Sequence, residues 1–105
     1  MTAGDRRILE LFAGQVRTVV PAARISAFGS RARGAAHRDS DFDLCVVLPG
    51  VTPQVREAIF AIAWEIGFAE GCVLAPIVMS EDDFERGPFS ASTLVRNIRR
   101  EGVAA

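Results

Sequence analysis

The sequence predicts a small α/β (α+β) domain in which helices flank a sheet of three or four strands. Segments with helical spacing of apolar residues alternate with short apolar runs typical of strands, in the order α-β-α-β-α-β-α. The chain has 105 residues, which corresponds to one domain over residues 1–105. Half of the residues are hydrophobic, which is enough to build a core.

The first predicted helix covers residues 5–20 and stops at Pro21. Its apolar residues follow helical spacing: Ile8, Leu9, Phe12, Val16 and Val19. Residues 24–28 are short, alternate in part and end at Gly29, which favours a strand.

The next segment contains a short helix, a loop and the clearest strand. Ser30 can cap a helix over residues 31–33, and the composition of residues 34–39 indicates a loop. Residues 41–48 predict a strand. Because residues 44–48 are continuously apolar, we expect this strand to be covered on both faces.

A second long helix and a third strand follow. Thr52 and Pro53 have the character of a helix cap and a first helical residue, and Gly67 is predicted to end the helix. Its apolar stripe is Val55, Ile59, Ile62 and Ile66. Residues 72–79 predict a strand in which Pro76 indicates an edge position or a bulge.

Two helices complete the chain. Ser80 precedes three acidic residues, 81–83, as expected at a capped helix start. The last helix covers about residues 90–101, with Leu94 and Ile98 on its apolar side, and Gly102 can end it.

Composition excludes several classes of protein. The formal net charge of −1 argues against broad binding of nucleic acid. Cys45 and Cys72 lie in apolar runs and fit neither a zinc motif nor a disulfide scaffold, which indicates reduced core thiols. Charged residues at positions 5–7 argue against a signal peptide, and no apolar run reaches the length of a membrane span. We therefore expect a soluble, cytoplasmic protein.

Two carboxylates, Asp41 and Asp43, stand at the start of the predicted strand 41–48. A strand directs residues i and i+2 to the same face, so both would point the same way while Phe42 turns into the core. Carboxylate oxygens suit Mg²⁺. The pair is therefore a candidate site for two Mg²⁺ ions, which lie about 3.5–4 Å apart in sites of this kind.

The Gly29-Ser30 turn ahead of this pair is a candidate phosphate site. Gly29 lets the backbone approach a phosphate without a Cβ in the way, and Ser30 offers a hydroxyl and a backbone amide. Arg31 and Arg33 are long enough to reach triphosphate oxygens, although a solvated surface position suits them equally. Ser40 is either a partner of the site or a loop residue. Together these residues predict binding of a nucleoside triphosphate with Mg²⁺.

The motif over residues 29–44 resembles the signature of the minimal nucleotidyltransferases, small members of the DNA polymerase beta superfamily. The motif reads Gly29-Ser30, three residues, Gly34, five residues, then Ser40-Asp41-Phe42-Asp43-Leu44. The resemblance implies a mixed sheet flanked by helices and a Mg²⁺-dependent transfer of a nucleoside monophosphate from a nucleoside triphosphate to an acceptor hydroxyl. It also implies phosphate contact for Gly29 and Ser30 and metal binding for Asp41 and Asp43.

The family usually carries a third carboxylate on a later strand, which helps to activate the acceptor hydroxyl. The matching strand, residues 72–79, contains no Asp or Glu, and Ala75 or its neighbour stands where the acid is expected. Glu70 and Glu81 flank this strand, and Glu65 on the preceding helix is a poorer candidate. Because a general base contributes about 10²–10⁴-fold to a rate, its loss would slow the reaction without removing the metal site.

Two main functions remain open. The first is an enzyme that nucleotidylates a hydroxyl on a protein, a nucleic-acid end or a small molecule such as an aminoglycoside. For this enzyme the resemblance implies a HEPN-domain partner protein, with the chain as the antitoxin of a toxin–antitoxin pair. The alternative is a degenerate module that binds nucleotide or a partner without turnover, which the missing acid favours. The intact acid pair favours the enzyme, because such acids repel unless a cation joins them. A structural domain with a coincidental motif ranks below both.

Overall fold

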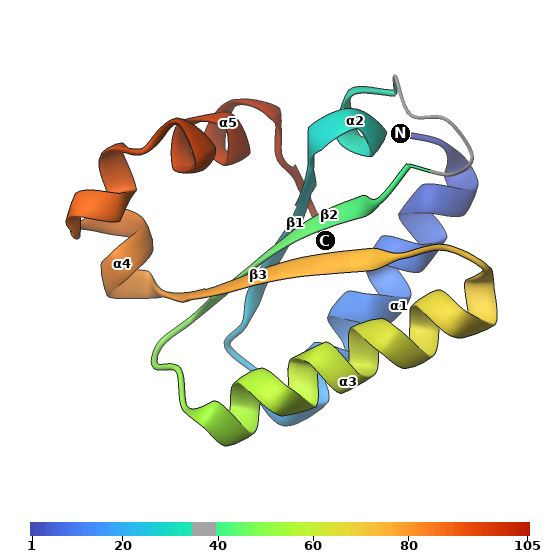
Figure 1. Ribbon diagram of the computed structural model, residues 1–105, viewed down its shortest axis with the longest axis horizontal. Helices are drawn as coiled ribbons and strands as arrows, with labels where there is room; N and C mark the ends of the chain where they lie inside the picture. The colour runs from blue at the N-terminus through green and yellow to red at the C-terminus, as the bar shows by residue number, and fades with distance from the viewer. Residues whose placement is uncertain (35–39) are drawn as a thin grey trace.

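The computed structural model describes residues 1–34 and 40–105, so most of the predicted loop over residues 34–39 lies outside the described residues. Helices and strands follow one another much as the sequence predicts (Figure 1). In chain order they are α1 (Ala3–Val19), β1 (Arg24–Phe28), α2 (Gly29–Arg33), β2 (Phe42–Leu48), α3 (Pro53–Glu70), β3 (Leu74–Ser80), α4 (Glu81–Glu85), the 3₁₀ helix η1 (Pro88–Ala91), α5 (Thr93–Glu101) and β4 (Val103–Ala104).

The strands form one mixed sheet in the order β3-β2-β1-β4. β1 runs antiparallel to β2 and β4, whereas β2 runs parallel to β3 and reaches it through α3. This mixed sheet flanked by helices confirms the predicted fold class. No sequence pattern marks β4 as a separate strand, because it consists of two residues paired with Ser26 and Ala27.

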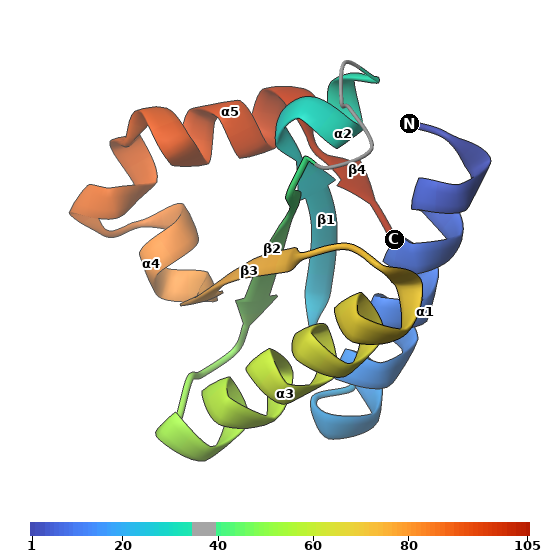
Figure 2. The ribbon, with the colours of Figure 1, turned by 45° about the vertical axis from the view of Figure 1, so that its right-hand side comes forward.

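β2 lies in the middle of the molecule and is buried on both faces, as its continuously apolar sequence predicts. Phe42, Leu44 and Val46 belong to a core shared with α1 and α3. Cys45 and Val47 belong to a second cluster formed with α4 and α5. Figure 2 shows α1 and α3 on one side of the sheet and α4 and α5 on the other. The sheet is therefore covered by helices on both faces.

The end of α3 differs from the prediction. The helix continues past Gly67 to Glu70, so the expectation that Gly67 ends it is wrong. Gly67 is needed for close packing, because a Cβ there would lie 2.6 Å from the carbonyl oxygen of Cys72. The helix ends at Gly71, whose φ of 71° is the left-handed conformation that glycine adopts readily. The predicted cap at the other end, Thr52, is confirmed by its hydrogen bond to the first turn.

Other boundaries shift by a few residues. β3 begins at Leu74 rather than at residue 72, and α5 begins at Thr93 after η1, with Ser92 as its cap. Ser80 caps α4 as predicted, since its hydroxyl accepts from the backbone N–H of Asp83 at 3.1 Å. Among the helices of the described ranges, none combines the length and the hydropathy that crossing a bilayer requires.

Pro76 lies on an edge strand, which confirms one of the two positions predicted for it. Because Phe42 N donates to Val73 O, alternate residues of β3 direct their backbone groups to β2, and the others, including Pro76 and Val78, direct theirs outward. Proline has no N–H to offer there, and Arg56 donates to the Val78 carbonyl oxygen at 3.4 Å. This edge is therefore poorly suited to pairing with another strand.

Candidate functional site

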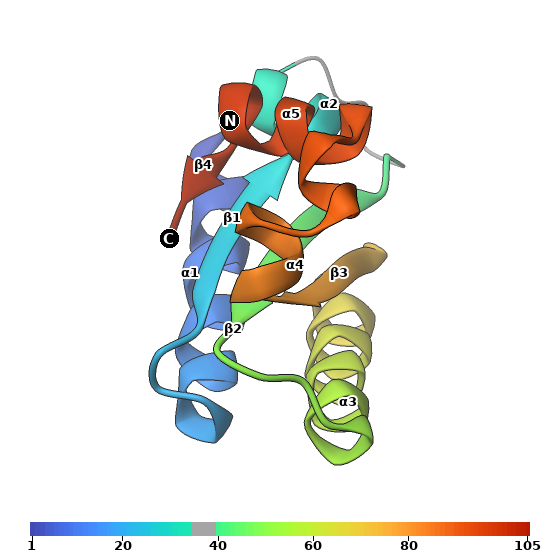
Figure 3. The same cartoon turned by 90° about the vertical axis from the view of Figure 1, so that its left-hand side faces the viewer.

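Gly29 directly follows β1 and is the first residue of α2. Figure 3 shows the end of β1 running into α2. The antiparallel register pairs Phe28 with Asp43, so the turn after Phe28 meets the Asp43 side chain. Gly29 has a φ of 74°, a left-handed conformation that costs little only for glycine. A Cβ on Gly29 would collide with Asp43 Oδ2 and lie 3.3 Å from Cγ. The predicted phosphate turn therefore reaches the predicted metal ligand because residue 29 has no side chain.

α2 starts at Gly29, so the prediction that Ser30 caps this helix is wrong. Phe28 occupies the cap position, and its side chain makes no capping hydrogen bond. The start of α2 follows from the end of β1, because the extended backbone ends at Phe28 and the helical turn begins at the next residue. Ser30 lies partly buried in the first turn, directly after the glycine that adjoins Asp43.

The two predicted metal ligands lie on either side of a fully buried Phe42. β2 begins at Phe42, so Asp41 stands just ahead of the strand rather than inside it, which corrects the predicted boundary. Asp41 is exposed, and Asp43 is half-buried. Burial and the neighbouring charge of Asp41 raise the pKa of Asp43, while Arg33 lowers it. The two carboxylates thus repel one another, and a shared cation would relieve this repulsion.

Arg31 is a buried anchor of the site, with its side chain only 9% exposed. Its Nη1 donates to Asp5 Oδ1 at 2.8 Å, and its Nε and Nη2 donate to the Ser40 carbonyl oxygen at 3.1 and 2.8 Å. The guanidinium also lies 5.2 Å from the centre of the Phe42 ring. These contacts fix the backbone just ahead of Asp41. They favour a positioning role for Arg31 over the triphosphate contact considered for it, and a role for Ser40 as a partner of the site over that of a plain loop residue.

Arg33, by contrast, is half exposed and lies one helical turn after Gly29. Its Nη1 bonds Glu101 Oε2 of α5 at 3.0 Å. No sequence pattern points to this contact, because Glu101 is 68 residues further along the chain. The same is true of Asp5, which meets Arg31 across 26 residues. Both acids belong to the surroundings of the site and were missed by reasoning from local motifs.

The strand neighbour of Asp43 carries no acid. In the parallel register of β2 and β3, the partner of Asp43 is Ala75. Ala75 therefore stands where the third carboxylate of the family is expected. The side chain opposite Asp43 is thus a methyl group, which can neither bind a metal nor accept a proton.

The three acids considered as replacements lie elsewhere. Glu70 forms an ion pair with Arg7 of α1. Glu81 follows β3 at the opposite end of the sheet, where Ser80 pairs with Leu48, roughly 16 Å along the strands from the level of Asp43. Glu65 is exposed on α3, a helix that packs on the other face of the sheet. None of the three therefore supplies the missing carboxylate in this conformation.

The donor set fits a metal ion that arrives with its substrate. Within residues 1–34 and 40–105, no group of three or more His, Cys, Asp or Glu side chains is arranged to hold a metal alone. Magnesium usually takes one or two carboxylates and completes its shell with phosphate oxygens and water. Asp41 and Asp43 match that requirement, and the backbone at Gly29 packs directly against the Asp43 carboxylate.

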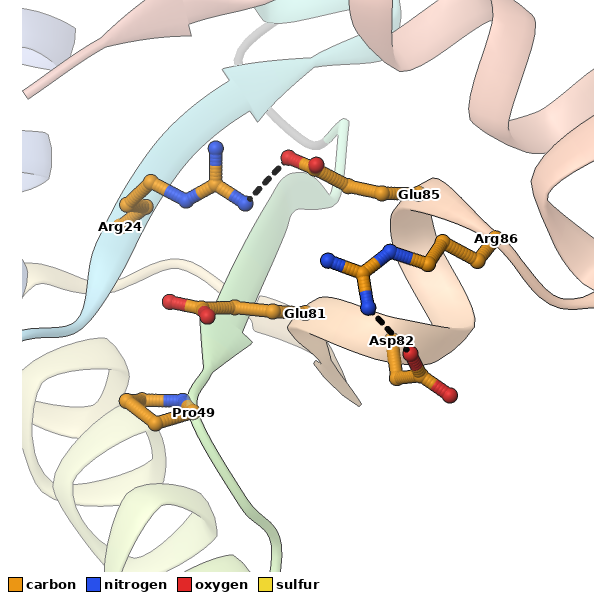
Figure 4. Close-up of a pocket in the computed structure, with 6 residues that line it drawn as sticks. All are labelled: Arg24, Pro49, Glu81, Asp82, Glu85 and Arg86. Atoms are coloured by element: carbon orange, nitrogen blue, oxygen red, sulfur yellow. Dashed lines mark hydrogen bonds and ion pairs between the residues drawn. The ribbon is translucent and has the colours of Figure 1, made fainter.

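An open cavity of about 510 Å³ lies at the other end of the sheet (Figure 4). Figure 4 shows Arg24 directed at Glu85, and Arg86 at Asp82, with N–O distances of 3.0 and 3.3 Å. Arg24 pairs with Val47, four residues along β2 from Asp43. The cavity and its ion pairs are therefore separate from the carboxylate pair and contribute nothing to its chemistry.

The chain is similar to known proteins in sequence and in fold. The sequence model described as "Nucleotidyltransferase domain" matches residues 9–104. No curated protein sequence matches the chain. Similar solved structures include a toxin–antitoxin with AMP-PNP, at 21% identity and a TM-score of 0.62, covering 95% of this chain and 70% of that one. A mutant of the toxin–antitoxin MntA–HpeT is similar at 19% identity and a TM-score of 0.61, with the same coverage.

The solved structures share the fold at low sequence identity, whereas the match of the family model spans nearly the whole chain, including the turn at Gly29 and both aspartates. The chain belongs to the nucleotidyltransferase domain family.

Proposed function

We propose that this protein is a Mg²⁺-dependent nucleotidyltransferase that moves a nucleoside monophosphate from a nucleoside triphosphate to a hydroxyl of a partner protein. One observation carries the proposal. The turn that would hold phosphate is packed, through Gly29, against the Asp43 carboxylate that would hold metal. If the turn and the acid pair had unrelated functions, this close packing between them would not be required.

Each residue has a defined task in this proposal. Asp41 and Asp43 hold Mg²⁺, with two ions expected, and the backbone and hydroxyl of Ser30 contact the triphosphate. Arg33 is exposed enough to reach a phosphate oxygen, while Arg31 keeps the backbone at Ser40 in place. Held by these two aspartates, Mg²⁺ would supply the positive charge that neutralises the triphosphate and the developing charge of the transfer. A structural relative crystallised with AMP-PNP supports the choice of a nucleoside triphosphate as the ligand.

A transfer assay tests the reaction. The protein is incubated with Mg²⁺, the product of the adjacent gene and each of the four nucleoside triphosphates labelled at the α-phosphate. We expect one nucleotide to label the partner protein, and no label with EDTA or with Asp43→Asn. A tight complex of the two proteins that acquires no label with any nucleotide would exclude turnover.

A second candidate function, nucleotide or partner binding without turnover, is supported by Ala75 standing opposite Asp43. Placing an acid at position 75 distinguishes the enzyme from the module that binds without turnover. If the carboxylate alone is missing, Ala75→Asp should raise the transfer rate by about 10²-fold or more. Ala75→Asn is the matched control, with nearly the same shape and no charge. Wild-type transfer that Ala75→Asp does not increase would mean that this acid is dispensable here.

The partner protein has a candidate surface on α3. Phe60, Trp64 and Phe68 follow one another on its outer side, 44%, 69% and 78% exposed, and the Trp64 and Phe68 rings stack at 5.3 Å. Together they expose roughly 400 Å² of apolar area, about half of one side of a stable interface. A groove of about 280 Å³ lies beside them, reaching Val73 just ahead of β3. Because the β3 edge disfavours strand pairing, we propose that the partner docks a helix here.

Both toxin–antitoxin relatives support a protein partner, and we propose a toxin of the HEPN type, with this chain as its antitoxin. The need for a nucleoside triphosphate makes the cytoplasm the expected compartment. Trp64 reports on docking directly, since the chain has one Trp and no Tyr. We expect its emission to shift to the blue on complex formation, and Phe68→Ser to weaken the complex at least tenfold. Leu11→Ser, an apolar position on α1 that is 39% exposed, is the control. Unchanged emission in a formed complex would exclude this surface.

A further inference from the structure

The proposed reaction leaves the ion pair between Arg33 and Glu101 unexplained, although the charge of Arg33 acts on Asp43. Arg33 Nη1 lies 3.0 Å from Glu101 Oε2, and the Glu101 side chain is only 19% exposed. Glu101 is the last residue of α5, and the backbone after it is fixed because Gly102 N donates to Ile98 O at 2.8 Å. The acid is thus held in place, while the arginine it binds is half exposed.

Geometry brings Arg33 close to the metal site. Gly29 adjoins the Asp43 carboxylate, and Arg33 follows it by four residues on α2, so both face the same side of the helix. Arg33 bonds the Glu101 carboxylate, and it also lies near enough to Asp43 for its charge to lower the pKa of that carboxyl. It can bond Glu101, as the structure has it, or it can bond the carboxylates of Asp41 and Asp43.

The second arrangement would compete with metal binding. A guanidinium takes carboxylate oxygens through charge-assisted hydrogen bonds, and Mg²⁺ requires the same oxygens. Two aspartates that repel each other would attract the nearest flexible cation. A fixed acid on α5 provides that cation with another partner.

We propose that Glu101 is a positioning residue that holds Arg33 beside the carboxylates of Asp41 and Asp43 rather than on them, and so keeps both open to a divalent cation. The inference rests on the proposed function in one respect, that these two carboxylates bind metal. Arg33 remains close enough to meet a phosphate when a nucleotide arrives. Arg100 also contacts Glu101, at 3.5 Å, but its side chain is 72% exposed and comes from α5 itself.

A double-mutant cycle tests the inference with Mn²⁺ alone. Binding is measured by electron paramagnetic resonance of free Mn²⁺ for wild type, Glu101→Gln, Arg33→Gln and the double variant, with folding checked by circular dichroism. Glu101→Gln should weaken Mn²⁺ binding about threefold to fivefold, the range expected for a partly exposed ion pair. Arg33→Gln should strengthen it or leave it unchanged. The double variant should match Arg33→Gln, and Arg100→Gln should match wild type.

The other outcomes overturn the inference in distinguishable ways. If Glu101→Gln weakens binding equally with and without Arg33, Glu101 acts through its own charge or through the packing of α5. A further outcome is that wild type binds Mn²⁺ through Asp41 and Asp43 with an affinity that neither single variant changes. In that case the ion pair has no influence on the site. If wild type binds no Mn²⁺ through these aspartates, the metal site of the proposed function fails as well.

Discussion

At the scale of single residues, Gly29 shows how one missing side chain can define a site. Its φ of 74° disfavours any other residue, and the Asp43 carboxylate occupies the space a Cβ would need. The two constraints are independent, since one concerns the backbone and the other a neighbour. Both arise because β1 ends opposite Asp43.

Gly29→Ala should therefore damage both stability and the site. The left-handed conformation alone costs about 1–2 kcal/mol for alanine, and displacement of Asp43 should weaken Mn²⁺ binding at least tenfold. Urea unfolding and metal titration measure the two effects. Gly14→Ala is the matched control, because a Cβ there meets nothing within 4 Å and the position is inside α1. That control should gain about 0.5–1 kcal/mol. Equal behaviour of the two variants would contradict the account.

The raised pKa of Asp43 predicts how the free energy of unfolding changes with pH. Burial and Asp41 raise its pKa in the folded protein above the ordinary 3.8, so the native state holds this proton more tightly than the unfolded chain. Its contribution to stability is then complete below pH 3.8 and is lost as the pH rises through the raised pKa. In EDTA, Asp43→Asn should be more stable than wild type at pH 7, and the difference should shrink as the pH falls.

Urea unfolding at several pH values measures this difference. Glu57→Gln, an exposed acid on α3, is the control and should follow wild type within about 0.5 kcal/mol. Adding Mg²⁺ should stabilise wild type and leave Asp43→Asn unchanged. A stability gap that grows on acidification would refute the cause assigned to Asp43.

The residues that local spacing can reveal are those whose partners are near in sequence. Gly29, Asp41 and Asp43 stand within one motif, and reasoning from spacing and strand geometry brings them together. For Arg31 and Arg33 the sequence leaves triphosphate contact and a solvated surface position equally open, because their partners, Asp5 and Glu101, come from distant helices. A charged side chain on a short helix indicates that it can reach an acid or a phosphate. It does not indicate which of them is the partner.

At the scale of elements, α2 is tied to its neighbours through Arg31. This side chain joins α1, through Asp5, to the backbone at Ser40 that leads into β2. The orientation of the proposed metal site therefore depends on α1, which contributes no residue to that site. Breaking this link should loosen the site and the fold together.

Arg31→Ala should cost about 3 kcal/mol of unfolding free energy, because it leaves Asp5 and the Ser40 carbonyl without this buried partner. Asp5→Asn should cost less, since Arg31 keeps its bonds to Ser40. Urea unfolding of both and of the double variant gives the coupling energy. Strict additivity of the two costs would mean that the pair is not an interacting unit.

Whole elements were predicted where their pattern is long and their ends carry clear signals. α1, β1 and β2 are examples, and Thr52 and Ser80 mark helix starts correctly. The predicted end of α3 is wrong because the sequence does not distinguish the roles of its two glycines. Gly67 allows close packing, whereas Gly71 adopts the left-handed conformation that ends the helix. The two-residue β4 is held by β1 and has no pattern of its own.

At the scale of the whole molecule, the proposed metal site and the proposed docking surface occupy separate regions. The carboxylates lie where β2 begins, while the aromatic stripe of α3 lies on the helical layer packed against the other face of the sheet. A partner docked on α3 would leave the acid pair open, as a hydroxyl acceptor requires. This separation is a property of the fold, which the order of elements alone does not show.

The most direct test of the central claim is calorimetric titration of a non-hydrolysable nucleoside triphosphate with Mg²⁺ into wild type and into an Asp41→Asn, Asp43→Asn double variant. The account predicts binding by wild type that requires Mg²⁺ and falls at least tenfold in the double variant, with the fold intact by circular dichroism. Equal affinity of the two proteins for the Mg²⁺–nucleotide would contradict it.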